Sequence, residues 1–294
     1  GFRQFMAEHM VSFPAANLDD IRDAIKAFRE LNRWFASPAF SLAFERAFVL
    51  AGKTGSGKTH GTCDAAHRRL TEGLLSCVTF GHLFGGQPDP WTRILENLGL
   101  SVVIGRDGLL DALNAAGEAS GRELILFIDA INDTRPLRYW RERLDAIVQE
   151  VQRRPFLRLC VTCRTSFLQS CLPENCTCQI VEHAGFTGAE RIACRTFFQH
   201  YGIEPPIAPI LQPELANPLY LKLICETVHA MDLKRLPAGW TGLAPVLRAF
   251  LYEKEKEFAI ENGLSGNYAI VKGSLRAIAQ AIADSGNSAL PASH

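Results

Sequence analysis

The feature that most constrains the fold is the glycine-rich run Gly52–Thr59, whose sequence is GKTGSGKT. The apolar run Phe48–Ala51 precedes it, and a segment with helical composition follows it. Glycines permit backbone conformations that side chains forbid, so successive main-chain amides can turn toward one point. In such a strand–loop–helix unit, these amides and the positive end of the helix dipole hold the phosphates of a nucleotide. The run therefore predicts a phosphate-binding loop at the edge of a sheet.

Two side chains at the end of this loop have predicted roles of their own. Lys58 is expected to bridge the β- and γ-phosphates, and Thr59 is expected to hold Mg²⁺ through its hydroxyl. The alternative is a glycine-rich turn with an exposed lysine. The pattern G-x-x-x-x-G-K-[ST] arises by chance in roughly one in a hundred chains of this length, and its flanking segments favour the binding role.

A second candidate group follows the apolar run Leu124–Ile128. Asp129 comes directly after that run, and in a parallel sheet this position lies at the same edge as the phosphate loop. Asp129 is therefore expected to reach the Mg²⁺ water shell, and Asp133 to orient the attacking water or accept its proton. A helix cap or turn acid is the alternative for Asp129, and ordinary turn chemistry in Asn132–Thr134 is the alternative for Asp133.

Another strand-like run, Leu157–Cys163, ends in Arg164. If this strand lies between the strands that carry Gly52 and Asp129, Arg164 faces the γ-phosphate and reports its presence. The alternative is a surface arginine.

The order of the elements predicts the fold class. Short apolar runs alternate with helical patterns up to Gly202, which implies parallel strands covered by helices, and beyond Gly202 the period is helical only. An amphipathic segment, 18–48, forms a helical lead-in with apolar residues at spacings of three and four. The expected strands are Ala47–Ala51, Leu75–Phe80, Leu124–Ile128, Phe156–Thr162 and Gln179–Val181. The expected helices within the α/β region cover 58–72, 90–98, 107–119, 138–152 and 188–201.

Composition narrows the class of protein. Of the 294 residues, 47% are apolar and 21% charged, and Lys+Arg and Asp+Glu both number 31, so nucleic-acid binding is not indicated. Apolar stretches such as Leu124–Ile128 are far shorter than the roughly 20 residues of a membrane span, and the start lacks a secretory signal. We therefore expect a cytoplasmic protein without a membrane span. Because the chain begins at Gly1 and ends just after a helix-like run, we expect a piece of a larger protein.

Nine cysteines are an odd number in a long chain with a sizeable core, whereas secreted disulfide frameworks are short and usually hold an even number, so we interpret the cysteines as reduced thiols. Cys160 and Cys163 have C-x-x-C spacing, and Cys171, Cys176 and Cys178 follow, which leaves zinc binding as an alternative. A buried strand over the first pair argues against it.

With these motifs in place, the sequence resembles the STAND class of P-loop NTPases, close to the NACHT group, over most of its length. Asp129–Asp133 resembles the acidic motif of that class, and Val161–Arg164 resembles its sensor strand, which usually ends Thr-Ser-Arg. Asn217–Leu219 resembles the Asn-Pro-Leu element that begins a helix of the small helical domain. Lys58–His60, Phe84–Trp91 and the Asp-Ala-Ile-Asn core are most similar to the NTPase module of prokaryotic antiviral STAND proteins of the AVAST type.

The resemblance implies an α/β fold with a parallel-sheet P-loop NTPase core of the ASCE type, followed by a small helical domain and the start of a winged-helix-like region. The implied boundaries are 1–45 for the lead-in, 46–185 for the α/β domain, 186–260 for the helical domain and 261–294 for the partial winged helix. It implies ATP or ADP with Mg²⁺ as cofactors. The residues assigned to the nucleotide are Gly52, Thr54, Gly55, Ser56, Gly57, Lys58, Thr59, His60 and Pro218, the last packing on adenine. The metal ligands are Thr59 and Asp129, and the catalytic residues are Lys58, Asp129, Asp133 and Arg164.

The implied function is an ATP-binding and hydrolysing signal-transduction switch that self-associates when activated, its trigger being a phage protein sensed outside this chain. No Asn/Thr-Lys-x-Asp run for reading guanine occurs, which favours adenine. Asn132 and Asp133 are shorter and less acidic than the Asp-Glu pair common in NACHT proteins, so we expect slow hydrolysis. A nucleotide-dependent scaffold that scarcely hydrolyses ATP is the main alternative. A P-loop kinase is a weaker one, because no acceptor site or mobile lid is indicated.

Overall fold

The computed structural model describes residues 18–86, 89–205, 213–237, 240, 243–262 and 270–285. Its centre is a five-stranded sheet in the order β2-β3-β4-β1-β5, in which every neighbouring pair is parallel. The strands are β1 (Ala47–Gly52), β2 (Ser76–Phe80), β3 (Leu124–Asp129), β4 (Leu157–Arg164) and β5 (Gln179–Glu182). The helices around the sheet are α4 (Lys58–Thr71), α5 (Pro90–Asn97), α6 (Gly105–Ala119), α7 (Leu144–Gln152) and α8 (Leu168–Cys171). All five predicted strands are confirmed to within two residues.

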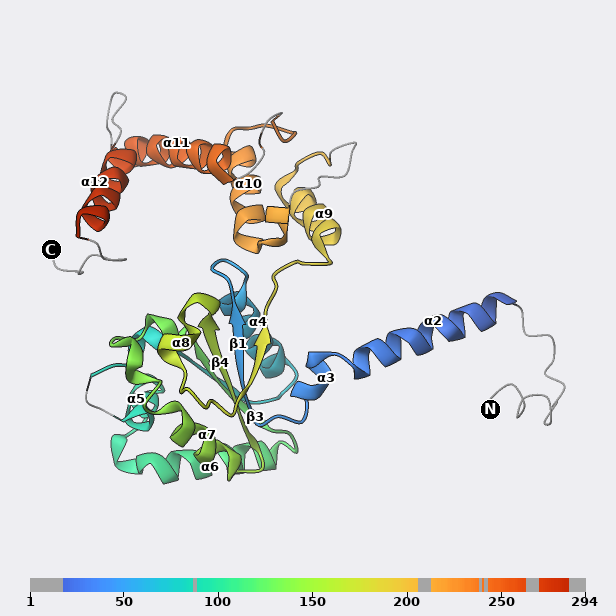
Figure 1. Ribbon diagram of the computed structural model, residues 1–294, viewed down its shortest axis with the longest axis vertical. Coiled ribbons are helices and arrows are strands. Elements are labelled where there is room, and N and C mark those ends of the chain that lie inside the picture. Colours follow the sequence, from blue (N-terminus) through green and yellow to red (C-terminus); the bar gives the residue numbers. More distant parts are fainter. Residues whose placement is uncertain are drawn as a thin grey trace.

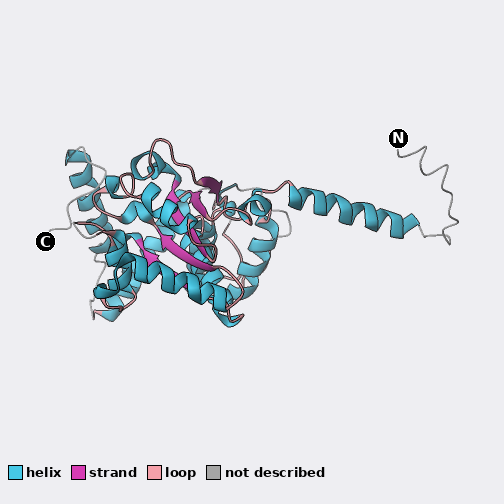
Figure 2. Ribbon diagram, turned by 90° about the horizontal axis from the view of Figure 1, so that it is seen from below, coloured by secondary structure: helices cyan, strands magenta, loops and turns pink. Residues whose placement is uncertain are grey.

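Both faces of the sheet are buried, which explains why its central strands read as continuous apolar runs (Figure 2). One face packs against α5, α6 and α7 in the larger apolar core, which includes Leu95, Leu110 and Val148. The other face packs against α4 in a smaller core that contains Ala66, Phe127 and Cys160. The α/β fold predicted from the alternation of strands and helices is therefore confirmed.

The strand β4 lies between β1 and β3, with Gly52 level with Arg164 in one pair and Ile128 level with Val161 in the other. This is the condition on which the predicted position of Arg164 depended. Because all three strands run in the same direction, their carboxyl ends meet at one edge of the sheet, directly below the helical part of the molecule (Figure 1).

The helical part follows β5 and consists of α9 (Glu190–Tyr201), α10 (Pro218–Ala230), α11 (Leu243–Glu261) and α12 (Ile270–Ser285). It has an apolar core of its own, formed mainly by α9 and α10 and including Phe198, Leu221 and Val228. The helical period predicted beyond Gly202 is thus confirmed. The predicted winged-helix-like start includes α12 and otherwise lies largely outside the described residues, so it stays a prediction.

The lead-in forms α2 (Leu18–Phe35) and the short α3 (Pro38–Leu42), and α2 extends away from the rest of the molecule (Figures 1 and 2). Its predicted apolar stripe carries Ile25, Phe28, Leu31 and Phe35, which are 45% to 68% exposed. The predicted lead-in also included residues 1–17, which lie outside the described residues. Within the described segments, no helix combines the length and the apolar character that crossing a membrane requires.

One predicted helix has a different start. The segment 138–152 is helical only from Leu144, and a short 3-10 turn occupies Leu137–Tyr139. Trp140 is fully buried, and its indole Nε1 donates a hydrogen bond of 2.6 Å to the hydroxyl of Thr134. Phe84 stacks edge-on against the same indole. These tertiary contacts keep the segment before Leu144 out of a regular helix.

Candidate functional site

The loop between β1 and α4 has the backbone that the glycine pattern predicts. Gly57 has a φ of 96° and stands at the N-terminal end of α4 without a side-chain cap. That conformation is accessible to glycine and strained for residues with a Cβ. The amides of the first turn of α4 therefore point from the helix end toward the loop without a capping side chain among them, as anion binding requires.

Lys58, the first residue of α4, is 9% exposed. Its Nζ donates to the carbonyl oxygens of Gly52 and Lys53 at 2.8 and 3.0 Å. Burial lowers the pKa of this ammonium, and the guanidinium of Arg164 lowers it further. Gly52 thus contributes a carbonyl that positions Lys58. A phosphate at the loop would replace neutral carbonyl partners by charged oxygens, which bind an ammonium more strongly.

Thr59 and Asp129 lie on different elements but are in direct contact. The hydroxyl of Thr59 donates to Asp129 Oδ2 at 2.7 Å, and the hydroxyl of Thr162 donates to Asp129 Oδ1 at 2.6 Å. Asp129 is 1% exposed. The amide of Ala130 completes the set by donating to the Thr162 hydroxyl at 2.8 Å. The structure therefore brings together the two predicted metal ligands, whose hydroxyl and carboxylate oxygens are donors that Mg²⁺ accepts.

Thr162 was not predicted as a site residue, although the sensor-strand resemblance includes it. Its side chain connects β4 to the end of β3 and holds the carboxylate of Asp129 from the side opposite Thr59. No residue spacing reveals this role, because the two strands meet only through the parallel register of the sheet.

Asp133 and Arg164 face each other at the edge of the sheet. Arg164 Nη2 lies 3.6 Å from Asp133 Oδ1, and each side chain is 41% exposed. Asn132 contacts both residues, since its Nδ2 donates to Asp133 Oδ1 at 2.7 Å and its Oδ1 accepts the Arg164 amide at 2.9 Å. The predicted water-orienting acid and the predicted γ-phosphate sensor are thus held as one cluster with Asn132.

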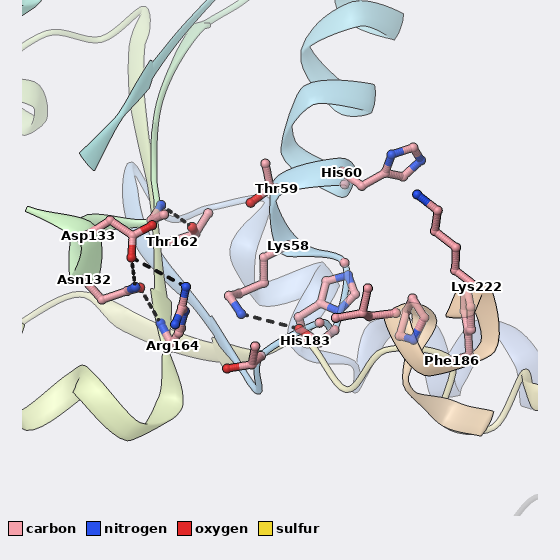
Figure 3. Close-up of a pocket in the computed structure, with 18 of the residues that line it drawn as sticks. Lys58, Thr59, His60, Asn132, Asp133, Thr162, Arg164, His183, Phe186 and Lys222 are labelled. Carbon is pink, nitrogen blue, oxygen red and sulfur yellow. Dashed lines mark hydrogen bonds and ion pairs between the residues drawn. The ribbon is translucent and has the colours of Figure 1, made fainter. Parts of the chain in front are cut away.

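Most of these groups line one cavity of about 760 Å³ that opens between the sheet edge and the helical part. Figure 3 shows Asn132, Asp133 and Arg164 on one side, Lys58 between, and His183, Phe186 and Lys222 opposite. The remaining predicted nucleotide residues on its wall are Thr54, Gly55, Ser56, Gly57, Thr59, His60 and Pro218. Gly52 and Asp129 do not line the cavity, but their oxygens accept hydrogen bonds from Lys58 and Thr59, which do. The predicted residues therefore lie together.

The far wall also contains residues that the sequence did not indicate. His183 and Phe186 follow β5, Phe197 comes from α9, and Lys222 comes from α10. The rings of Phe186 and Phe197 pack edge-on with centroids 5.9 Å apart. Flat apolar side chains opposite a phosphate loop offer a surface on which a base can lie. Sequence carried no signal for them, because three separate elements supply them.

The cysteines do not form a shared site of the kind that C-x-x-C spacing suggested. Cys160 belongs to the core beneath α4, whereas Cys163 belongs to the core on the opposite face of the sheet. Burial raises the pKa of the Cys160 thiol to about 12. Among the residues that the structure describes, no three His, Cys, Asp or Glu side chains are grouped as metal ligands.

The fold and the site together define the class of protein. A glycine-rich loop joins β1 to α4, an acidic residue ends β3, and one strand separates the two. This is the α/β core of a P-loop NTPase of the ASCE type, with a helical region after it.

Comparisons with known proteins give likeness in fold only. No protein-family model matches the chain, and no curated protein matches it in sequence. The Walker-type ATPase PABY2304 of Pyrococcus abyssi is 14% identical with a TM-score of 0.44, covering 86% of this chain and 77% of that one. Cdc6p of Pyrobaculum aerophilum is 14% identical with a TM-score of 0.39, covering 87% and 66%. RuvB of Thermotoga maritima is 18% identical with a TM-score of 0.33, covering 81% and 77%. Such scores carry no argument about function.

Proposed function

We propose that this chain is the nucleotide-binding module of an ATP-dependent signal-transduction switch of the STAND class. The observation that carries the proposal is the meeting of Lys58, Thr59 and Arg164 on one cavity that borders the helical part, with Asp129 hydrogen-bonded to Thr59. A cavity of about 760 Å³ has the size of a small-molecule cofactor site. The ordered resemblance of the motifs supports the choice of this class.

The proposed ligand is ATP with Mg²⁺. The amides of the loop and the ammonium of Lys58 bind its phosphates, and Thr59 and Asp129 hold the metal, which neutralises charge on the phosphate oxygens. Pro218 and the aromatic rings of the far wall accommodate the adenine. His60 lines the cavity from the first turn of α4 (Figure 3), where it contacts the nucleotide from the helix side.

The proposed activity is slow ATP hydrolysis. Asp133 is an acid that lines the cavity, and its carboxylate is paired with Arg164 and hydrogen-bonded by Asn132. Both donors contact the same carboxylate oxygen, Oδ1, so this oxygen is not free to orient a water molecule while the pair with Arg164 is in place. Arg164 must therefore turn from Asp133 toward the phosphate before Asp133 can orient water.

That same pair favours the second candidate function, a scaffold that retains its nucleotide and self-associates with little hydrolysis. In both the switch and the scaffold, the nucleotide contacts the loop and the far wall, and these contacts shift the equilibrium between positions of the helical part. A ligand shifts such an equilibrium only through contacts that differ between the states. We propose homo-oligomerisation as the output and a phage protein, sensed outside this chain, as the trigger. These two elements rest on the resemblance to antiviral STAND proteins.

The first step identifies any nucleotide released when the purified chain is denatured. The second step measures the rate of phosphate release from ATP in the presence of Mg²⁺. Asp133→Asn is the test variant, and Asp64→Asn is its control, because Asp64 pairs with Arg68 on the surface of α4, outside the cavity. Turnover that only Asp133→Asn removes supports the hydrolysing switch. Retained nucleotide without turnover supports the scaffold. A chain that binds neither ATP nor ADP contradicts both.

A further inference from the structure

We infer that Asn217 is a positioning residue that fixes the base side of the cavity against the phosphate loop. The inference rests on the proposed nucleotide binding and adds a residue whose side chain spans the two parts of the molecule. Asn217 directly precedes α10, and its Nδ2 donates to the carbonyl oxygen of Thr54 at 3.0 Å. The amide of Leu219 donates to the next loop carbonyl, that of Gly55, at 3.1 Å.

The same side chain also caps its own helix. Asn217 Oδ1 accepts the amides of Leu219 and Tyr220 at 3.0 and 3.2 Å, as an N-cap residue does. One amide group therefore serves two purposes, the oxygen for the helix and the nitrogen for the loop. Aspartate and serine cap helices comparably well, but an ionised carboxylate has no donor and a serine hydroxyl is too short to reach the loop while capping.

The contact between loop and helix is close as well as hydrogen-bonded. A Cβ placed on Gly55, where φ is +75°, would lie 2.7 Å from Leu219 Cβ and 2.9 Å from Asn217 Oδ1. The segment after β5 is held by the same helix start, because the amide of Phe186 donates to the carbonyl of Ala216 at 2.7 Å. The position of the far wall relative to the loop thus depends on the few residues around Asn217.

A ligand that touches both the phosphate loop and the far wall fits only when the contact around Asn217 holds the two at the right distance. The phosphates contact Lys58 and Thr59, whose hydrogen-bond partners Gly52 and Asp129 lie within the α/β core. The base contacts Pro218 and Phe186, whose distance from the loop the Asn217 bridge sets. Without the bridge, part of the binding energy must be used to bring that wall into place, because ordering a loose element opposes association. The cost falls on base-containing ligands and spares inorganic tripolyphosphate.

The experiment compares Asn217→Asp and Asn217→Ser with the unmodified chain by calorimetry, using ATP and inorganic tripolyphosphate, each with Mg²⁺. Both variants keep a cap oxygen, so α10 is retained, and thermal unfolding checks this. We expect ATP affinity to fall about three- to tenfold in both, the value of one hydrogen bond, with tripolyphosphate affinity within about twofold. Asn97→Ser is the control, since it removes another asparagine-to-threonine bond, to Thr79, away from the cavity.

Unchanged ATP affinity in the serine variant would overturn the inference, and so would an equal loss for both ligands, which would place the effect on the loop itself. If the unmodified chain binds tripolyphosphate and ATP while the variants match it, the proposed function stands and only the role of Asn217 fails. If the unmodified chain binds neither ligand, the proposed function fails and this inference fails with it.

Discussion

On the phosphate wall of the cavity, Lys58 is 9% exposed, and Asp129, which accepts a hydrogen bond from Thr59 of that wall, is 1% exposed. On the opposite wall, Leu219 is 45% exposed and the side chain of Lys222 is 55% exposed. The buried groups hold one another through hydrogen bonds within the sheet edge and its loop. The exposed groups depend on the start of one helix for their position. The phosphate wall is thus preorganised by the α/β core, whereas the far wall, called the base wall below, is positioned by the docking of the helical part.

The largest expected effect follows from removing the cation of the phosphate wall. Lys58→Ala should weaken ATP roughly 100-fold, because charge-assisted bonds to phosphate are lost from a buried position. Lys53→Ala, a change at the exposed lysine of the same loop, is the matched control and should alter affinity less than about threefold. Calorimetry measures both. Equal affinities for the two variants would mean that the phosphate wall does not depend on Lys58.

A smaller effect is expected from Asp129→Asn. The substitution keeps the shape of a residue that is buried between two threonine hydroxyls, but it removes the charge that favours a divalent cation. ATP affinity in the presence of Mg²⁺ should fall about tenfold, while affinity in EDTA changes little. Asp64→Asn should leave the Mg²⁺ dependence intact. Full Mg²⁺ dependence in the Asp129 variant would remove this residue from the metal site.

The base wall should respond more weakly and more selectively. Pro218→Ala removes apolar surface next to the loop, so ATP affinity should fall about threefold with tripolyphosphate unaffected. Pro213→Ala, at the exposed start of the preceding 3-10 turn, should change neither affinity. Calorimetric titration of each variant with ATP and with tripolyphosphate gives the ratio of the two affinities. An equal fall in affinity for ATP and tripolyphosphate would mean that Pro218 affects phosphate binding as well as binding of the base.

The smallest effect is a change with pH. Burial and Arg164 lower the pKa of Lys58, and a bound phosphate favours its charged form, so the complex holds this proton to higher pH than the free protein does. Affinity should be full at pH values below the lowered pKa of free Lys58 and should fall as pH rises through that pKa. In Lys58→Arg, whose guanidinium does not titrate in this range, the decline should disappear. A decline that persists in that variant would assign it to another group.

The phosphate wall could be predicted from sequence because its signals are local. The glycines of the loop, the apolar runs of the strands and the acid at the end of β3 each lie within a few consecutive residues. The positions of Thr162 and Phe186 could not be predicted, since each acquires its neighbours only from strands and loops that are distant in sequence. The late start of α7 has the same origin, in the burial of Trp140 against Phe84 and Thr134.

The sequence by itself determined that a strand, a glycine-rich loop and a helix follow one another here, because steric freedom and apolar periodicity act within a short stretch of chain. It also determined the order of the other strands along the chain. Only the tertiary structure decided that β4 lies between β1 and β3, that Arg164 pairs with Asp133, and that Asn217 reaches Thr54. Those contacts depend on how separate elements pack, and an ion pair across 31 residues or a hydrogen bond across 163 residues leaves no periodic pattern in a sequence.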